Sequence, residues 1–383
     1  MNEIYLDYAA TTPIHPDVLT VLSASYQRFY ANPSSIHRQG REAKLAIDMA
    51  REIVCDSIHA KPLEIFFTAG GTESDNMAVA GFLTANSERG KHIISSEMEH
   101  PAVLNTLLHF RDKFGFELSF VDINSDGSLD LAHFESLIRP DTILTSLMYV
   151  NNEIGVINPI AEIGRLCKIH NIALHCDAVQ AFGKVPINLD ELPIDIMSTS
   201  SHKIYGPKGA GFTFIRKGIK VDRINYGGSQ EFDKRSGTEN VHAIVAFGKA
   251  IEIRQEIMRD EFNRLEKLRD RFITSLKDSI TDIQINGTTA QQLPHIVNIS
   301  FAGCDGEAML LNLDSEGICV SAGSACASGS RKASKVIQAI PMDSRFRTAP
   351  IRFSMGSETN EDQIKQTVSA LIKVVERLRQ SKK

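Results

Sequence analysis

The chain has no tryptophan, no long apolar run and no Cys-x-x-Cys pair among its six cysteines. A membrane helix needs roughly 18 consecutive apolar residues, and the first residues have neither the basic nor the apolar region of a secretory signal. Six scattered cysteines do not form a disulfide framework, and their spacing does not favour a zinc or thioredoxin-like site. We therefore predict a cytoplasmic protein with reduced thiols, no membrane contact and no bound metal.

A large excess of charge of one sign is also lacking. The formal net charge is −5 over 383 residues, so electrostatics gives no reason to expect nucleic acid as a direct partner. Hydrophobic residues make up 42% of the chain and charged residues 23%, which is typical of a globular protein. The length suits one large and one smaller domain.

Short apolar runs alternate with amphipathic stretches between residues 64 and 216. This alternation predicts an α/β fold with a mainly parallel sheet flanked by helices. Ligands of such sheets bind beyond the carboxyl ends of the strands, so polar residues there are candidates for a site. The predicted strands are Ile65–Phe67, His92–Ser95, Glu117–Val121, Thr142–Tyr149, Ile172–Cys176, Ile194–Thr199 and Gly211–Ile215.

A long charged amphipathic stretch without proline follows, from Val241 to Ile280. Its pattern predicts a helix that leads into a second domain. We predict a large domain at residues 15–254 and a small domain formed by residues 1–14 and 255–383.

A lysine stands in the most informative segment, Ser200–Gly209, which reads SSHKIYGPKG. Lys203 follows an apolar run and a Ser/His pair, and precedes a Gly/Pro turn that lets the backbone approach a ligand closely. A lysine so placed can form a Schiff base with an aldehyde, and pyridoxal phosphate is the usual aldehyde. The alternative is a surface lysine beside a turn.

An anion site is indicated by the segment Thr68–Asn76, where an apolar strand enters and a helix leaves. Gly71 and Thr72 at the helix start would present backbone N–H groups to a phosphate, helped by the helix dipole. The alternative is a plain turn with Thr72 as the N-cap. The segment matches neither nucleotide-binding glycine motif.

Three further polar groups follow predicted strands. Asp177 could pair with a pyridinium nitrogen, or cap a helix. His100 could stack on a flat ring or move a proton, although a capping or core histidine has the same pattern. Asn152 offers an amide to a ligand, or belongs to a polar turn.

A thiol and an arginine complete the candidates. Every residue of 321–330 other than Cys326 is glycine, alanine or serine, a composition that predicts a mobile loop with an exposed, reactive thiol. Arg352 lies between apolar neighbours on a strand-like run, where its planar fork suits a carboxylate. An internal salt bridge is the alternative for Arg352.

These motifs together resemble the pyridoxal-phosphate-dependent cysteine desulfurases of the class V aminotransferase-like group. Four more segments carry the resemblance, and the ordered motifs cover nearly the whole chain. They are Tyr5–Pro13, Asn32–His37, Gly227–Glu231 and Arg235–Asn240. The resemblance implies a fold-type I pyridoxal-phosphate transferase, with a large α/β domain and a smaller α+β domain that carries the cysteine loop.

The resemblance also implies a role for each matching residue. Lys203 would hold the cofactor and move a proton, Asp177 would pair with the ring nitrogen, and Gln180 would bond the phenolic oxygen. His100 would stack on the ring and assist proton transfer. The implied phosphate ligands are Gly71, Thr72, Ser200 and His202, with Thr238 from the second subunit of a homodimer. Asn152, also near the cofactor, and Arg352 would hold the substrate carboxylate.

The implied reaction converts L-cysteine to L-alanine. Cys326 would attack the substrate sulfur, become a persulfide and deliver the sulfur to an acceptor protein, such as an iron–sulfur scaffold or a tRNA-thiolation enzyme. The form of the loop resembles the branch with the longer mobile cysteine segment. The alternatives are a selenocysteine lyase, another class V aminotransferase, and a sulfur-trafficking adaptor without catalysis.

Overall fold

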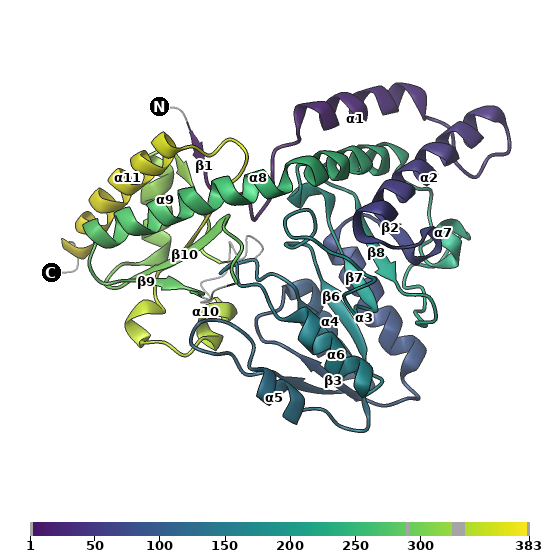
Figure 1. Cartoon of the computed structure of the whole chain (residues 1–383), viewed down its shortest axis with the longest axis horizontal. Helices are drawn as coiled ribbons and strands as arrows, with labels where there is room; N and C mark the ends of the chain where they lie inside the picture. The colour runs from purple at the N-terminus through teal and green to yellow at the C-terminus, as the bar shows by residue number, and fades with distance from the viewer. Residues whose placement is uncertain (1–2, 289–290, 324–333, 381–383) are drawn as a thin grey trace.

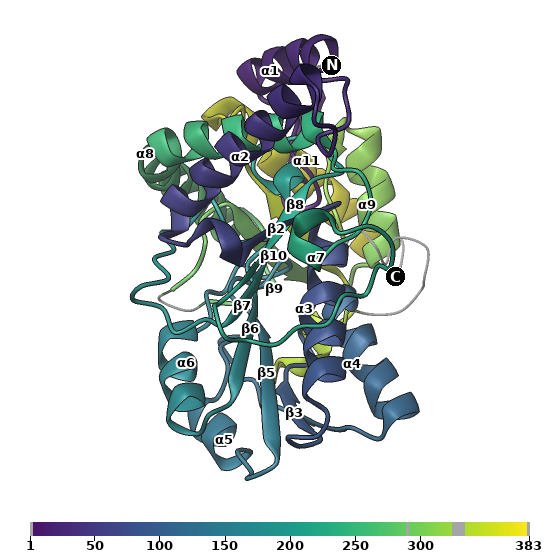
Figure 2. The ribbon, with the colours of Figure 1, turned by 90° about the vertical axis from the view of Figure 1, so that its right-hand side faces the viewer.

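The computed structural model describes residues 3–288, 291–323 and 334–380. Figures 1 and 2 show a larger α/β unit and a smaller unit, with helix α8 (Val241–Ser279) running along both. Both ends of the chain lie on the smaller unit (Figure 1).

A seven-stranded sheet forms the centre of the larger unit, in the order β2-β8-β7-β6-β5-β3-β4. Neighbouring strands are parallel except at β8, which is antiparallel to both β7 and β2. The predicted mainly parallel sheet is therefore confirmed, and each predicted strand is present with ends shifted by at most two residues. The strands are β2 (Ile65–Thr68), β3 (His92–Ser95), β4 (Glu117–Phe120), β5 (Thr142–Met148), β6 (Ala173–Asp177), β7 (Ile196–Ser198) and β8 (Gly211–Ile215).

Helices cover both faces of this sheet. Successive residues of a strand point to opposite faces, and in β2 Phe66 belongs to the apolar cluster under α3 and α4, whereas Ile65 and Phe67 belong to the cluster under α2, α6 and α8. Helix α1 packs against α8. The helices are α1 (Pro16–Arg28), α2 (Arg38–Ile58), α3 (Gly71–Asn86), α4 (Pro101–Phe114), α5 (Leu131–Ser136), α6 (Ile160–Ile169) and α7 (Gln230–Asp233), with the 3₁₀ turns η1 (Pro62–Glu64) and η2 (Ser201–Lys203).

The smaller unit has its own antiparallel sheet, in the order β12-β10-β9. Strand β1 (Ile4–Tyr5) crosses to this unit and pairs with β11 (Ile318–Cys319), so that Ile4 and Leu6 enter its separate apolar core. The remaining elements are β9 (Ile283–Asn286), β10 (Ile296–Phe301), α9 (Gly306–Ser315), α10 (Lys335–Ala339), η4 (Ser344–Phe346), β12 (Pro350–Ser354) and α11 (Glu361–Gln380). The domain limits at residues 14 and 254 stay a prediction. The separate apolar cores of the larger and the smaller unit agree with it.

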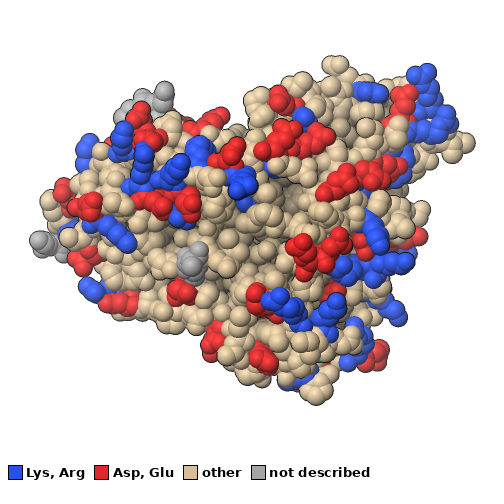
Figure 3. Space-filling model, in the orientation of Figure 1, with Lys and Arg blue, Asp and Glu red and all other residues tan. Residues whose placement is uncertain are grey.

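Two surface properties bear on function. Within the described part of the chain, no helix combines the length and hydropathy that a membrane crossing requires. Figure 3 shows positive and negative side chains interspersed over one face of the molecule, in keeping with the small net charge.

Candidate active site

A cavity of about 190 Å³, partly open to solvent, lies at the carboxyl ends of β5 and β6 and at the start of α3. Most of the predicted site residues line it together. Thr238 is exposed and is not among the lining residues, and Cys326 lies outside the described residues. The predicted residues on the cavity wall are Gly71, Thr72, His100, Asn152, Asp177, Gln180, Ser200, His202, Lys203 and Arg352.

One end of the cavity is suited to an anion. Helix α3 begins at Gly71, and its N-cap is Gly70, with φ 144°, rather than Thr72, so the first-turn N–H groups have no helical partner. The buried Ser200 Oγ has no hydrogen-bond partner among the described atoms. Burial and the nearby Lys203 lower the pKa of His202 to about 4, which leaves a neutral imidazole near pH 7. These groups fit a phosphate.

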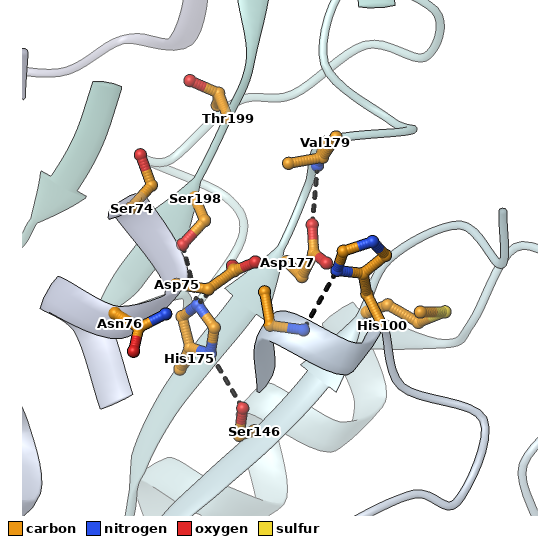
Figure 4. Close-up of polar contacts among 12 residues, drawn as sticks. Ser74, Asp75, Asn76, His100, Ser146, His175, Asp177, Val179, Ser198 and Thr199 are labelled. Carbon is orange, nitrogen blue, oxygen red and sulfur yellow. Dashed lines mark hydrogen bonds and ion pairs between the residues drawn. The ribbon is translucent and has the colours of Figure 1, made fainter. Parts of the chain in front are cut away.

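A buried carboxylate lies on the floor of the cavity. Asp177 ends β6, is 6% exposed, and accepts the Val179 N–H at 2.9 Å. Burial raises the pKa of Asp177, while His100 and Lys203 oppose that rise. Figure 4 shows the carboxylate next to the His100 ring. A cationic ring nitrogen would offset the cost of burying this charge.

The imidazole of His100 caps a helix and also lines the cavity. His100 is the N-cap of α4, and its Nδ1 accepts the Ala102 N–H at 3.1 Å. An accepting Nδ1 places the proton of the neutral ring on Nε2. Burial lowers the pKa of His100, Lys203 lowers it further, and Asp177 opposes this. The ring is therefore a neutral, flat group on the cavity wall.

A cluster of buried polar groups lies beside Asp177, and we did not predict it. His175 points from β6 between Ser146 Oγ at 2.8 Å and Ser198 Oγ at 3.0 Å (Figure 4). Asp75 Oδ1 lies 3.8 Å from His175 Nε2. Burial lowers the pKa of His175 to about 3, and burial followed by the charge of Asp177 raises the pKa of Asp75. The i, i+2 spacing of His175 and Asp177 was the available signal, because it puts both on one face of the strand.

The lysine lies in η2, and the N-terminal arm holds it. Lys203 Nζ donates to the carbonyl oxygens of Ala9 and Ala10, both at 2.7 Å. Thr12 fixes the arm, since its hydroxyl accepts the Tyr205 N–H at 2.7 Å. The arm thus closes one side of the cavity with backbone carbonyls, which no side-chain pattern could have predicted.

The arginine reaches the cavity from the smaller unit. Arg352 on β12 pairs with Asp7 Oδ1 at 2.8 Å and donates to the Asn152 carbonyl at 2.9 Å. The salt bridge considered as an alternative is therefore present, yet the buried Arg352 still lines the cavity. Asp7 was part of a recognised motif, but we had assigned it no role.

The described residues on both sides of the cysteine segment form hydrogen bonds near the cavity. A residue before the segment bonds Arg352, and the residue after it bonds Glu153. The backbones of Ser321 and Arg352 exchange hydrogen bonds of 2.6 and 3.2 Å. Ser334 Oγ donates to Glu153 Oε2 at 2.5 Å, and that carboxylate also lies next to Gly323. In contrast, the Cys319 thiol donates a hydrogen bond to Glu3 Oε1, and burial raises the pKa of Cys319 to about 11.

The sequence pattern of the aminotransferase class-V family matches residues 4–367. The chain belongs to this family. Among curated proteins it is similar to the cysteine desulfurase IscS of Dictyoglomus turgidum, with 46% identity over 378 residues, 99% of this chain and 96% of that protein. Among solved structures it is similar to a NifS-like protein, with 34% identity, 98% and 99% coverage and a TM-score of 0.90. A structure of SspA in complex with cysteine is 31% identical, with coverage of 92% and 98% and a TM-score of 0.78.

The family and the fold predicted from the sequence are confirmed. Enzymes of this family use pyridoxal phosphate, and the predicted cofactor is confirmed at that level. The part of the chain that the structure describes holds no group of three residues that could bind a metal ion.

Proposed function

We propose that this class-V enzyme is a cysteine desulfurase, which converts L-cysteine to L-alanine and holds the sulfur as a persulfide on Cys326. One observation carries the proposal. The two described flanks of the cysteine segment, at Ser321 and Ser334, are attached beside a cavity that contains Lys203 and Asp177. The full-length similarity to the protein named cysteine desulfurase IscS supports the same activity.

Pyridoxal phosphate, when bound, supplies an electron sink that accepts charge from the substrate. The N–H groups at Gly71 and Thr72, with Ser200 and His202, would hold its phosphate at the start of α3. Asp177, which is 6% exposed, would keep the ring nitrogen protonated through an ion pair.

Lys203 would bind the cofactor through its amine and afterwards move a proton at the substrate Cα. Its present partners, the Ala9 and Ala10 carbonyls, keep the amine on the cavity wall. Arg352 and Asn152 would orient the substrate carboxylate, because a guanidinium and an amide both donate to carboxylate oxygens. The Asp7 bond to one side of Arg352 fixes the plane of the guanidinium.

The sulfur step is supported by the position of Gly323, the last described residue before the cysteine segment. Cys326 comes three residues after Gly323, and three residues span at most roughly 11 Å. The Cys326 thiolate would attack the substrate sulfur. A sulfur–sulfur bond forms, the carbon–sulfur bond breaks, and its electron pair passes to Cβ, which takes a proton. The thiolate is oxidised to a persulfide and the substrate carbon is reduced to the methyl group of alanine.

A homodimer is part of the proposal, because Thr238 is exposed and is not on the cavity wall of its own chain. Thr238 from a second subunit would add a hydroxyl to the phosphate ligands. Several of the exposed large apolar side chains, which often mark an interface, belong to α1, its connection to α2 and the segment around α7, at one end of the larger unit (Figure 1). They are Tyr26, Tyr30, Ile36, Tyr226 and Phe232. Light scattering that gave the mass of one chain would contradict the dimer.

The sulfur acceptor completes the function. We propose that an acceptor protein takes the persulfide sulfur in the cytoplasm, with an iron–sulfur scaffold and a tRNA-thiolation enzyme as the two candidates. Radioactive sulfur from labelled cysteine should move from Cys326 to the true acceptor.

The decisive experiment measures alanine formed from L-cysteine by the cofactor-loaded protein with a thiol reductant. Wild type and Cys319→Ser should form alanine, whereas Cys326→Ser should keep the visible absorbance of the cofactor and form little. Equal alanine from Cys326→Ser would place the nucleophile elsewhere. Alanine from selenocysteine in all variants, and none from cysteine, would favour the selenocysteine lyase instead.

A further inference from the structure

A half-buried lysine behind the cavity helps to fix the orientation of an amide on its wall. Lys184 Nζ donates to Gln180 Oε1 at 2.8 Å, and Gln180 Nε2 donates to the Ala9 carbonyl at 2.9 Å. A backbone carbonyl can only accept a hydrogen bond. The amide nitrogen of Gln180 must therefore face Ala9, and its oxygen must face Lys184.

This orientation decides what Gln180 presents to the cavity that it lines. Its oxygen is bonded to Lys184, while one of the two hydrogens on its nitrogen is bonded to Ala9. The second N–H is thus the donor that Gln180 has left for a ligand in the cavity. A donor in this place suits an acceptor such as a phenolic oxygen.

Lys184 does not touch that cavity itself. It lines a small neighbouring cavity of about 30 Å³, between the N-terminal arm, α8 and residues 293–295. Burial lowers the pKa of Lys184, and the charges of Lys203, Arg254 and Arg352 lower it further, whereas Glu261 raises it. Its amine donates to Gln180 in either protonation state, so the orientation of the amide persists when the lysine loses its charge.

We propose that Lys184 is a positioning residue that, through Gln180, directs an N–H toward the phenolic oxygen of the cofactor. The proposal rests on the proposed cofactor contacts and adds a residue to them. The alternative is that Lys184 only stabilises the fold or only contributes positive charge to the site.

The test follows the visible absorption band of the bound cofactor as a function of pH. A donor to the phenolic oxygen stabilises the deprotonated form, so its loss raises the titration midpoint. Lys184→Met should raise the midpoint by about 0.5 to 1 pH unit, the size expected for one hydrogen bond. The matched control is Lys208→Met, which removes an exposed charge near His202 without touching Gln180 and should leave the midpoint unchanged.

A double-mutant cycle separates positioning from charge. In a Gln180→Leu background, Lys184→Met should cause no further shift of the midpoint. A shift of equal size with and without Gln180 would overturn the proposal and assign a charge effect to Lys184. An unchanged midpoint in Lys184→Met with intact Gln180 would also overturn it.

The failure of the proposed function would look different, because the wild type would then show no visible band with added pyridoxal phosphate. Thermal unfolding without the cofactor checks the fold of each variant. If Lys184→Met does not fold, Lys184→Leu takes its place in the same cycle, with the same expected shift.

Discussion

The two sides of the active-site cavity are built in different ways. On the side formed by the larger unit, Asp177 accepts the Val179 N–H and His100 accepts the Ala102 N–H, each within two residues along the chain. On the opposite side, Arg352 pairs with Asp7 across 345 residues and donates to the Asn152 carbonyl across 200 residues. The first side depends on strand ends and helix caps, whereas the second depends on docking of the arm and the smaller unit.

This difference predicts different consequences of mutation. Locally held groups keep their positions when a neighbour changes, so their loss should affect the chemical step. Groups held by distant segments orient the substrate and connect the two units, so their loss should affect substrate binding or stability. Four variants test the contrast, from the largest expected effect to the smallest.

Lys203→Ala should have the largest effect. It removes the amine that would bind the cofactor and move a proton, a role worth about 10²- to 10⁴-fold in rate. We expect no visible band from covalently held pyridoxal phosphate and alanine formation near background. Absorbance spectra and an alanine assay measure both, with Lys208→Ala as the control. A retained band at wild-type position would exclude Lys203 as the attachment point.

Asp177→Asn should have the second largest effect, and it tests the side of the cavity that strand ends and helix caps hold in place. The amide cannot hold a proton on the ring nitrogen by charge, and breaking a buried pair costs about 3 to 5 kcal/mol. We expect kcat to fall by about 10²- to 10³-fold, with a smaller change in KM. Asp195→Asn is the matched control, since its carboxylate bonds Leu174 N–H outside the cavity. Similar losses in both variants would mean that Asp177 has only a structural role.

Arg352→Lys tests the side built from distant segments. Lysine cannot keep the bonds to Asp7 and Asn152 and still present two parallel donors to a carboxylate. We expect kcat/KM for cysteine to fall about 10- to 100-fold, mainly through KM. Arg379→Lys, on the remote helix α11, is the control. A lower thermal midpoint with unchanged KM would limit Arg352 to the salt bridge with Asp7.

His175→Asn should have the smallest effect and concerns pH. The pKa of His175 is about 3 in the folded protein, below the usual 6.5 of an unfolded chain. The unfolded state therefore binds the extra proton between these values, and stability falls as the pH drops below 6.5. Between pH 7 and pH 5, we expect wild type to lose about 1 to 2 kcal/mol more than His175→Asn. Urea unfolding at both pH values measures this, and parallel losses would contradict it.

Much of the site was predictable because its residues follow predicted strands. Asp177, His100 and Lys203 stand at the carboxyl edge of a sheet whose alternation with helices is visible along the chain. Burial patterns alone do not show that β8 runs antiparallel to its neighbours, and the prediction did not specify this. The roles of the individual residues stay predictions until the variants are measured.

The missed residues share a physical reason. Lys184 lies behind a residue that lines the cavity, Asp75 lines the cavity beside His175, and Ala9 and Ala10 contribute only backbone carbonyls. None of these four positions carries a side-chain pattern that differs from that of ordinary core or loop residues. Their roles depend on contacts between segments that are far apart in sequence.

By itself, the sequence determined the alternation of strands and helices, the family and the side chains available for chemistry, because periodicity and local caps act within a few residues. Only the tertiary structure decided that the arm closes the cavity over Lys203, that Asp7 pairs with Arg352, and that Lys184 donates to Gln180. These contacts join residues whose backbones are positioned by the packing of two apolar cores. Packing of that kind is set by the whole chain, and no short segment carries it.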